Sequence, residues 1–163
     1  MGHRNTWTLL RQFPSISSEA LPVLEALVNQ LRREGWSTHD VFGIHLAVEE
    51  ALVNAITHGN SSEADKTVSV YFQVNADRLI VEVTDQGLGF NPRTVPDPTR
   101  GDRLSQPHGR GVMLMRALMD RVEYLGRGNH VVLEKHRGGC DLSESVALEL
   151  ALPAAAACYS TLS

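Results

Sequence analysis

The chain has 163 residues, of which 42% are hydrophobic and 21% are charged, so it can bury one hydrophobic core and leaves little room for a second domain. Its net charge of -4 argues against binding along a phosphate backbone, so we expect no nucleic-acid partner. No run of about 18 apolar residues is present, and the N-terminus lacks the apolar core of a signal peptide. We therefore expect no membrane segment and a cytoplasmic protein, and the two cysteines, Cys140 and Cys158, agree with a reducing compartment.

The first third of the chain predicts one strand and two helices. Residues 6–13 alternate weakly between polar and apolar side chains, as in an edge strand. Residues 19–34 carry apolar side chains at helical spacing. Ser37 or Thr38 then caps a second helix, which we expect to end at Gly59 in a left-handed conformation.

Four further segments predict strands. Residues 67–74 and 79–84 both alternate with period two and are joined by a short polar turn, which is typical of an antiparallel hairpin. Residues 121–126 and 129–135 predict a closing pair of strands. Together with the two helices, these strands favour a fold in which one face of a sheet packs against helices.

A long connection separates the two pairs of strands. Residues 91–108 contain four prolines and no periodic pattern, and a connection of this length is more often a functional lid than a plain loop. Gly109, Arg110 and Gly111 then open a third helix over residues 112–120.

The end of the chain differs in composition from the rest. Residues 138–163 contain no lysine or arginine, and Val146, Leu148, Leu150 and Leu152 alternate in a way that suits a strand, although the Ala, Leu and Glu content suits a helix equally well. We assign residues 1–137 to one domain and residues 138–163 to a C-terminal tail.

Three polar side chains lie on one face of the second predicted helix. Glu50, Asn54 and His58 are four residues apart, beside the apolar stripe rather than within it. Asn54 offers a neutral oxygen of the kind that binds Mg²⁺, and Glu50 is placed to accept a proton from a hydroxyl or water that attacks a phosphate. The alternative is a solvated glutamate, a surface asparagine and a histidine that packs against or caps the helix end.

Two glycine-bearing segments add to this face. Asp85 ends a predicted strand and is followed by Gly87 and Gly89. Gly109 and Gly111 allow backbone N–H groups to approach an anion, and the N-terminus of a helix favours negative charge. The order of the three segments predicts a phosphate-binding site, whereas each glycine pair alone is also compatible with an ordinary turn.

The three segments resemble known motifs of one superfamily. Glu50-x-x-x-Asn54-x-x-x-His58-Gly59 resembles the N box, Asp85-x-Gly87-x-Gly89 the first glycine box, and Gly109-Arg110-Gly111-Val112 the second glycine box of the GHKL ATP-binding proteins. Over about residues 6–137, the chain is most similar to the anti-sigma factor serine kinases of the RsbW/SpoIIAB type. This resemblance implies an α/β (α+β) two-layer sandwich, with a mixed, mostly antiparallel sheet and helices on one face, known as the Bergerat fold.

The resemblance also implies ATP and Mg²⁺ as cofactors and a role for each matching residue. Glu50 would be the catalytic base, Asn54 the Mg²⁺ ligand and Asp85 the acceptor of the adenine amino group. The other nucleotide-binding positions that it implies are Gly87, Gly89, Gly109, Gly111, Val112 and Asn129, the last standing where the family often has threonine. The basic group that the lid brings to the terminal phosphate would be Arg110, Arg103 or Arg100.

The function implied is that of a serine/threonine protein kinase and anti-sigma factor. Such a protein phosphorylates an antagonist of the STAS type, sequesters a sigma factor and forms a homodimer. The alternative from another class is a module that binds ATP and sequesters a partner without phosphorylating it. A third interpretation, a detached catalytic domain of a histidine kinase, lacks a helical hairpin with a phosphoacceptor histidine in the sequence.

Overall fold

The computed structural model of the chain describes residues 6–89 and 107–138. In this part of the chain, five strands form one sheet in the order β1-β2-β3-β5-β4. The strands are β1 (Trp7–Pro14), β2 (Thr67–Val74), β3 (Arg78–Asp85), β4 (Arg121–Leu125) and β5 (His130–His136). All four pairings between neighbouring strands are antiparallel.

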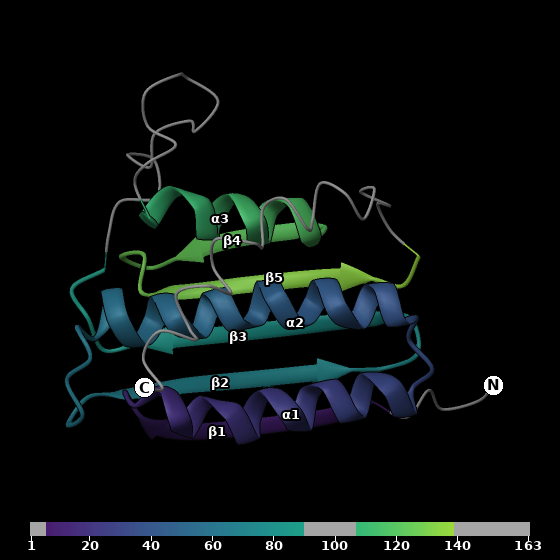
Figure 1. The fold of residues 1–163 in the computed structure, drawn as a ribbon, viewed down its shortest axis with the longest axis horizontal. Coiled ribbons are helices and arrows are strands. Elements are labelled where there is room, and N and C mark those ends of the chain that lie inside the picture. The colour runs from purple at the N-terminus through teal and green to yellow at the C-terminus, as the bar shows by residue number, and fades with distance from the viewer. Residues whose placement is uncertain (1–5, 90–106, 139–163) are drawn as a thin grey trace, which may run out of the picture.

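The helices lie on one face of this sheet, as Figure 1 shows. They are α1 (Ser17–Arg33), α2 (Thr38–Val53), its continuation η1 (Asn54–Gly59) and α3 (Pro107–Leu118). Ser37 caps α2, since its hydroxyl oxygen accepts a hydrogen bond from the N–H of Asp40 at 3.0 Å. The predicted sandwich with helices on one face of the sheet is confirmed, and among the described residues the sheet is wholly antiparallel rather than mixed. Within the described ranges, no helix is both long and apolar enough to cross a bilayer.

The core forms where the two periodicities of the sequence meet. Every second residue of β2 is buried, including Phe72, which is 0% exposed. Leu27 of α1 and Ile44 and Val48 of α2 are also fully buried. Alternation with period two turns one face of the strands toward the helices, and helical spacing turns an apolar stripe back toward the strands. This layer holds α2, and with it Glu50, against the centre of the sheet.

The structure differs from the sequence predictions at two helix ends. Gly59 ends η1, but it is not among the glycines with a positive φ, so the left-handed conformation expected there is wrong. The third helix begins at Pro107, so Gly109 and Gly111 lie within the helix rather than before it. Proline fits the first turn of a helix because it has no N–H to leave unbonded there.

Two predicted segments fall mainly outside the described residues. Of the expected lid, 91–108, only the last two residues are described, and they belong to α3. Of the tail, 138–163, only Gly138 is described.

Truncation of Phe72 should test the buried face of the sheet. We expect Phe72→Ala to lower the free energy of unfolding by about 3–5 kcal/mol, because it leaves a cavity in the packed layer. Leu10→Ala on the edge strand is the control: Leu10 is 70% exposed, so its loss should cost about 0.5 kcal/mol or less. Urea unfolding measures both, and equal losses would contradict the assignment of the core face.

Candidate functional site

The helix that carries the predicted polar row changes its winding at Asn54. From Asn54 to Gly59 the backbone is a π-helix, and the N–H of Asn60 donates to the carbonyl of Ala55, five residues earlier, at 2.9 Å. Single turns of π-helix are uncommon and occur often at functional sites. Because α-helical spacing ends at Asn54, it no longer places His58 on the same face as Glu50 and Asn54. The His58 side chain is exposed.

Asn60 joins this helix end to three strands. It is 0% exposed, and its amide nitrogen donates to the Ser15 hydroxyl at 2.6 Å and to the Thr67 carbonyl at 2.9 Å. Its amide oxygen accepts from the N–H of Gln86 at 2.8 Å. The sequence analysis did not single out Asn60. In the sequence, Asn60 is only an asparagine directly after the glycine that ends the helix. Asparagine is common at such positions, so this pattern does not predict a buried hydrogen-bond network.

Gly59 lies against the end of β3. A Cβ atom at Gly59 would overlap the carboxylate of Asp85, and a Cβ atom at Gly87 would overlap the carbonyl oxygen of Gly59. Gly59 and Gly87 are therefore glycines because the helix end, the Asp85 side chain and the turn after β3 are in direct contact. This contact brings Asp85 beside the helix that carries Asn54.

Gly89 makes a similar approach to the turn between β4 and β5. Its φ is +78°, and a Cβ atom there would overlap the carbonyl oxygen of Arg127. Both conditions exclude other residue types. The glycines predicted to make room for a nucleotide thus also make room for the backbone of the chain itself.

Asn129 fixes the main chain of Asp85 from the same turn. Its amide nitrogen donates to the Asp85 carbonyl at 2.8 Å, and its carbonyl accepts from the N–H of Asp85 at 3.0 Å. Both polar groups of the Asp85 backbone are therefore bonded to one residue. The Asn129 side chain, predicted from the resemblance to contact nucleotide, here acts on the strand that presents Asp85.

The Asp85 carboxylate is partly buried, and its pKa is raised above the ordinary aspartate value. Burial is the larger cause, while the hydrogen bond from the Gly87 N–H, at 2.8 Å, and the charges of Arg127 and Lys66 lower the pKa. The two cations and the N–H favour the ionised form. The result is a fixed hydrogen-bond acceptor at the rim of the helix layer.

Gly111 brings α3 onto the Glu50 side chain. A Cβ atom at Gly111 would overlap a carboxylate oxygen of Glu50, and it would lie 3.4 Å from the amide nitrogen of Asn54. The glycine-bearing end of α3 and the polar face of α2 therefore form one surface. This contact unites two of the three segments that the sequence predicted to act together.

Burial and a neighbouring charge both act on Glu50. Burial is the larger cause that raises the pKa of Glu50, and the negative charge of Glu49 raises it further. The sequence analysis assigned no role to Glu49. The carboxylate of Glu49 is exposed, yet it still acts on the proton affinity of its neighbour.

Comparison with known proteins agrees with this geometry. The family described as histidine kinase-like ATPase domain matches residues 15–135. This range includes α1, α2, η1, β2, β3, α3 and β4 in full and all of β5 except its last residue. The chain belongs to this ATPase family, as an RsbW-like member. ATP binding follows from membership.

Curated relatives give the same assignment. The chain is 38% identical over 117 residues to the serine-protein kinase RsbW of Bacillus velezensis, covering 66% of this chain and 71% of the relative. It is 30% identical over 111 residues to RsbW of Listeria monocytogenes, covering 64% and 71%. It is 29% identical over 101 residues to the anti-sigma F factor of Clostridium beijerinckii, covering 59% and 71%.

Tyr124 is a residue of this ATPase domain that the sequence reasoning missed. Burial raises the pKa of Tyr124 to about 12; the charge of Arg116 lowers it and that of Glu50 raises it further. The phenol is therefore neutral at physiological pH, within electrostatic range of Glu50. The only signal in the sequence was a tyrosine in a short strand, which is more often a packing residue.

The remaining predicted positions of the ATPase domain lie in different places. Val112 is 6% exposed and packs in the core, and Arg110 is exposed on the first turns of α3. Gly109 lies between them and the start of the helix. Arg103, like Arg100, lies outside the described residues.

Two glycine-to-alanine substitutions should show whether the close contact at Gly87 limits the stability of the domain. We expect Gly87→Ala to destabilise the ATPase domain by about 3 kcal/mol, because the new methyl group meets a backbone carbonyl that cannot move alone. Gly43→Ala is the control, since a Cβ atom there meets only a side-chain methyl of Leu118 at 3.4 Å. Its effect should stay within about 1 kcal/mol. Thermal unfolding compares the two, and a tolerated Gly87→Ala would disprove the close approach.

Proposed function

We propose that this chain is an ATP-dependent serine/threonine protein kinase that also acts as an anti-sigma factor. The observation that carries the proposal is the partly buried Glu50, one helical turn before Asn54 and in contact with Gly111 of α3. Relatives named serine-protein kinase and anti-sigma F factor support the same function.

Glu50 has the chemistry of a general base in this reaction. The oxygen of a substrate serine attacks the terminal phosphorus of ATP, the bond from that phosphorus to the bridging oxygen breaks, and ADP leaves. Glu50 accepts the proton that the serine hydroxyl loses. A carboxylate whose pKa is raised by burial accepts this proton more readily than an exposed one.

The residues around Glu50 fit the nucleotide and its metal ion. Asn54 provides a neutral oxygen for Mg²⁺, which in such sites usually takes few protein ligands beside phosphate and water oxygens. When bound, the ion neutralises charge on the phosphates. Asp85 is held as an acceptor for an amino group such as that of adenine.

We propose the partners and the compartment from the resemblance of the three motifs to the anti-sigma factor serine kinases. The substrate is an anti-sigma-factor antagonist of the STAS type, and the sequestered protein is a sigma factor, in keeping with the name of the Clostridium relative. The chain acts in the cytoplasm as a homodimer. The chain then binds either the antagonist, which it phosphorylates, or the sigma factor, which it sequesters, and one partner replaces the other.

Replacement of Glu50 should separate catalysis from binding. We expect Glu50→Gln to slow phosphate transfer to the antagonist by about 10²–10⁴-fold, because the amide cannot accept the serine proton, while ATP affinity stays near that of the wild type. Transfer from labelled ATP with Mg²⁺ and the antagonist measures the first quantity, and calorimetry measures the second.

Glu49→Gln is the matched control. It removes the neighbouring charge that helps to raise the pKa of Glu50, so transfer should continue, with the acid limb of its pH profile shifted to lower pH. Undiminished transfer by Glu50→Gln would refute the role of Glu50 as base. If the wild-type chain binds ATP and sigma factor but phosphorylates no antagonist, it is a sequestering module and not a kinase.

The raised pKa of Glu50 also predicts a pH-dependent cost in stability. A group whose pKa is higher in the folded state than in the unfolded state adds stability below its unfolded pKa, and this is lost as pH rises through the folded pKa. Glu50→Gln should therefore raise the thermal midpoint at pH 7 to 8, and the gain should disappear below the ordinary carboxyl pKa. A midpoint that falls at neutral pH would contradict the electrostatics of Glu50.

A further inference from the structure

A groove lies between α1 and α2, at the opposite end of α2 from Asn54. Its volume is about 170 Å³, and its lining residues are Val28, Arg32, Trp36, Thr38, Val41, Phe42 and His45. Val28, Trp36 and Val41 are buried and form an apolar floor, whereas Phe42 is 47% exposed at its side. The groove thus places one exposed aromatic side chain beside buried apolar residues.

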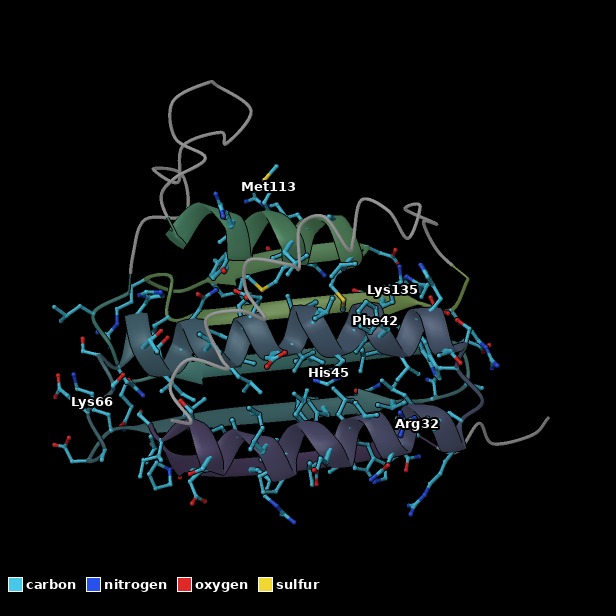
Figure 2. The ribbon with its side chains drawn as sticks, viewed as in Figure 1. Arg32, Phe42, His45, Lys66, Met113 and Lys135 are labelled. Carbon is cyan, nitrogen blue, oxygen red and sulfur yellow. The ribbon has the colours of Figure 1, made fainter. Side chains whose placement is uncertain are left out.

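One cation, Arg32, lies in the lining of this groove. Arg32 stands on the last turn of α1, and Phe42 and His45 stand on α2 (Figure 2). No carboxylate of the described residues forms an ion pair with Arg32, while His45 lies 3.8 Å from Glu49. A segment that fills the groove should therefore combine apolar side chains with carboxylates.

The C-terminal segment of the chain has this chemistry. Residues 139–163 contain Asp141, Glu144 and Glu149 and no lysine or arginine. Between Val146 and Leu152, every second residue is a large aliphatic one. In an extended segment such residues share one side, which suits an apolar floor, and Glu149 falls on the other side.

The last described residues before this segment lie beside the groove. The N–H of Arg137 donates to the Asp77 carbonyl at 2.9 Å, and its guanidinium donates to the carbonyls of Glu34, at 3.3 Å, and of Gly35. Gly35 directly precedes Trp36 in the groove. Arg137, two residues before the C-terminal segment, is thus bonded to the turn between α1 and α2.

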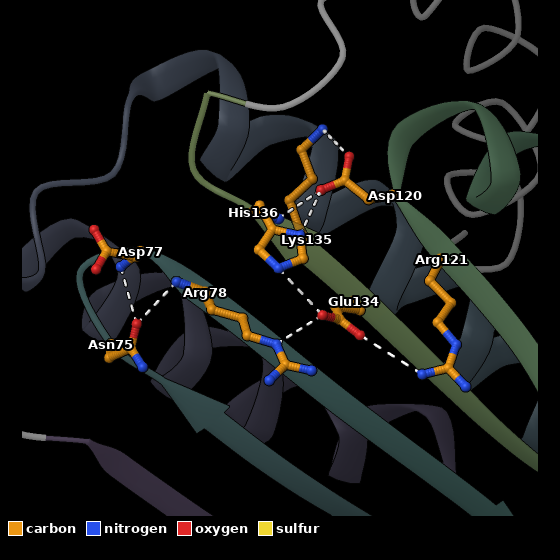
Figure 3. Close-up of polar contacts among 8 residues, drawn as sticks. All are labelled: Asn75, Asp77, Arg78, Asp120, Arg121, Glu134, Lys135 and His136. Carbon is orange, nitrogen blue, oxygen red and sulfur yellow. Dashed lines mark hydrogen bonds and ion pairs between the residues drawn. The ribbon is translucent and has the colours of Figure 1, made fainter.

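The end of β5 is held firmly at this corner. The N–H of His136 donates to the Asp120 carboxylate at 2.6 Å, and the Lys135 ammonium lies 3.6 Å from the same carboxylate (Figure 3). From Gly138 to Val146, an extended chain spans up to about 26 Å at about 3.3 Å per residue. The groove follows two turns of α2, about 11 Å, so the segment can reach all of it.

We propose that residues 139–163 of the same chain dock in the groove between α1 and α2. The aliphatic side chains from Val146 to Leu152 cover Trp36 and Phe42, and the carboxylate of Glu144, two residues before this stretch, pairs with Arg32. This intrachain contact does not depend on the proposed kinase activity.

A spin label on the tail tests this contact in the full chain. The only two cysteines lie in the tail, so Cys140→Ser and Cys158→Ser, combined with Ser145→Cys, give one labelling position beside the aliphatic stretch. We expect a nitroxide at this position to remove more than half of the amide signal intensity of Thr38, Phe42 and His45 in ¹⁵N spectra. Ser69 and Glu82, on the side of the sheet away from the helices, should keep theirs.

Two substitutions in the labelled chain identify the cause of the signal loss. Phe42→Ser and Arg32→Glu should each restore most of the intensity at Thr38, because both side chains are exposed and can be replaced without disturbing the core. Leu21→Ser is the matched control on α1: Leu21 is 57% exposed and lies outside the groove, so it should change nothing.

The remaining outcomes would overturn the proposal. Equal signal loss in the labelled parent chain and in its Phe42→Ser and Arg32→Glu versions would mean that the tail is near the groove only through its attachment. Signal loss at Ser69 or Glu82 would place the tail on the sheet. Loss that appears when labelled ¹⁴N chains are mixed with unlabelled ¹⁵N chains, and not within one chain, would assign the groove to a second copy.

Discussion

The close contact among Gly59, Asp85 and Gly87 is the constraint on which the site depends. Without side chains at the two glycines, the end of η1 lies directly on the carboxylate and turn that follow β3. Asn60 closes the same junction with three hydrogen bonds, to Ser15 directly after β1, to Thr67 of β2 and to Gln86 directly after β3. A bulkier residue would separate the helix layer from the strand end, and Asp85 and Asn54 would no longer belong to one site.

The packing that assembles the site also determines its electrostatics. Contact with α3 at Gly111 helps to bury Glu50, and burial raises the pKa of Glu50. A buried carboxylate opposes folding at neutral pH, but it is a better proton acceptor than an exposed one. Asp85 shows a different balance, since an N–H and two cations partly offset its burial. The two carboxylates therefore suit different tasks, proton transfer and hydrogen-bond acceptance.

Some of the fold was predictable because local patterns and tertiary packing agree. Alternating residues predicted β2 as it stands, residues 67–74, and predicted the next strand to within one residue at each end. Ser37 was one of two predicted caps, and it caps α2. The predicted start of α3 was wrong, because the two glycines that suggested a turn lie inside a helix that begins at Pro107. Glycine is compatible with both conformations, so its neighbours in space decided between them.

The order of the three polar segments, the spacing of Glu50 and Asn54 and the two periodicities that build the sandwich can all be read along the chain. These are local properties, since one turn of helix or one pleat of strand fixes them. The burial of Asn60, the hydrogen bonds from Asn129 to the backbone of Asp85 and the proximity of Tyr124 to Glu50 come instead from the packed structure. Each of these facts depends on residues far apart in the chain. No local pattern encodes them, because burial and hydrogen-bond partners arise only when the layers pack.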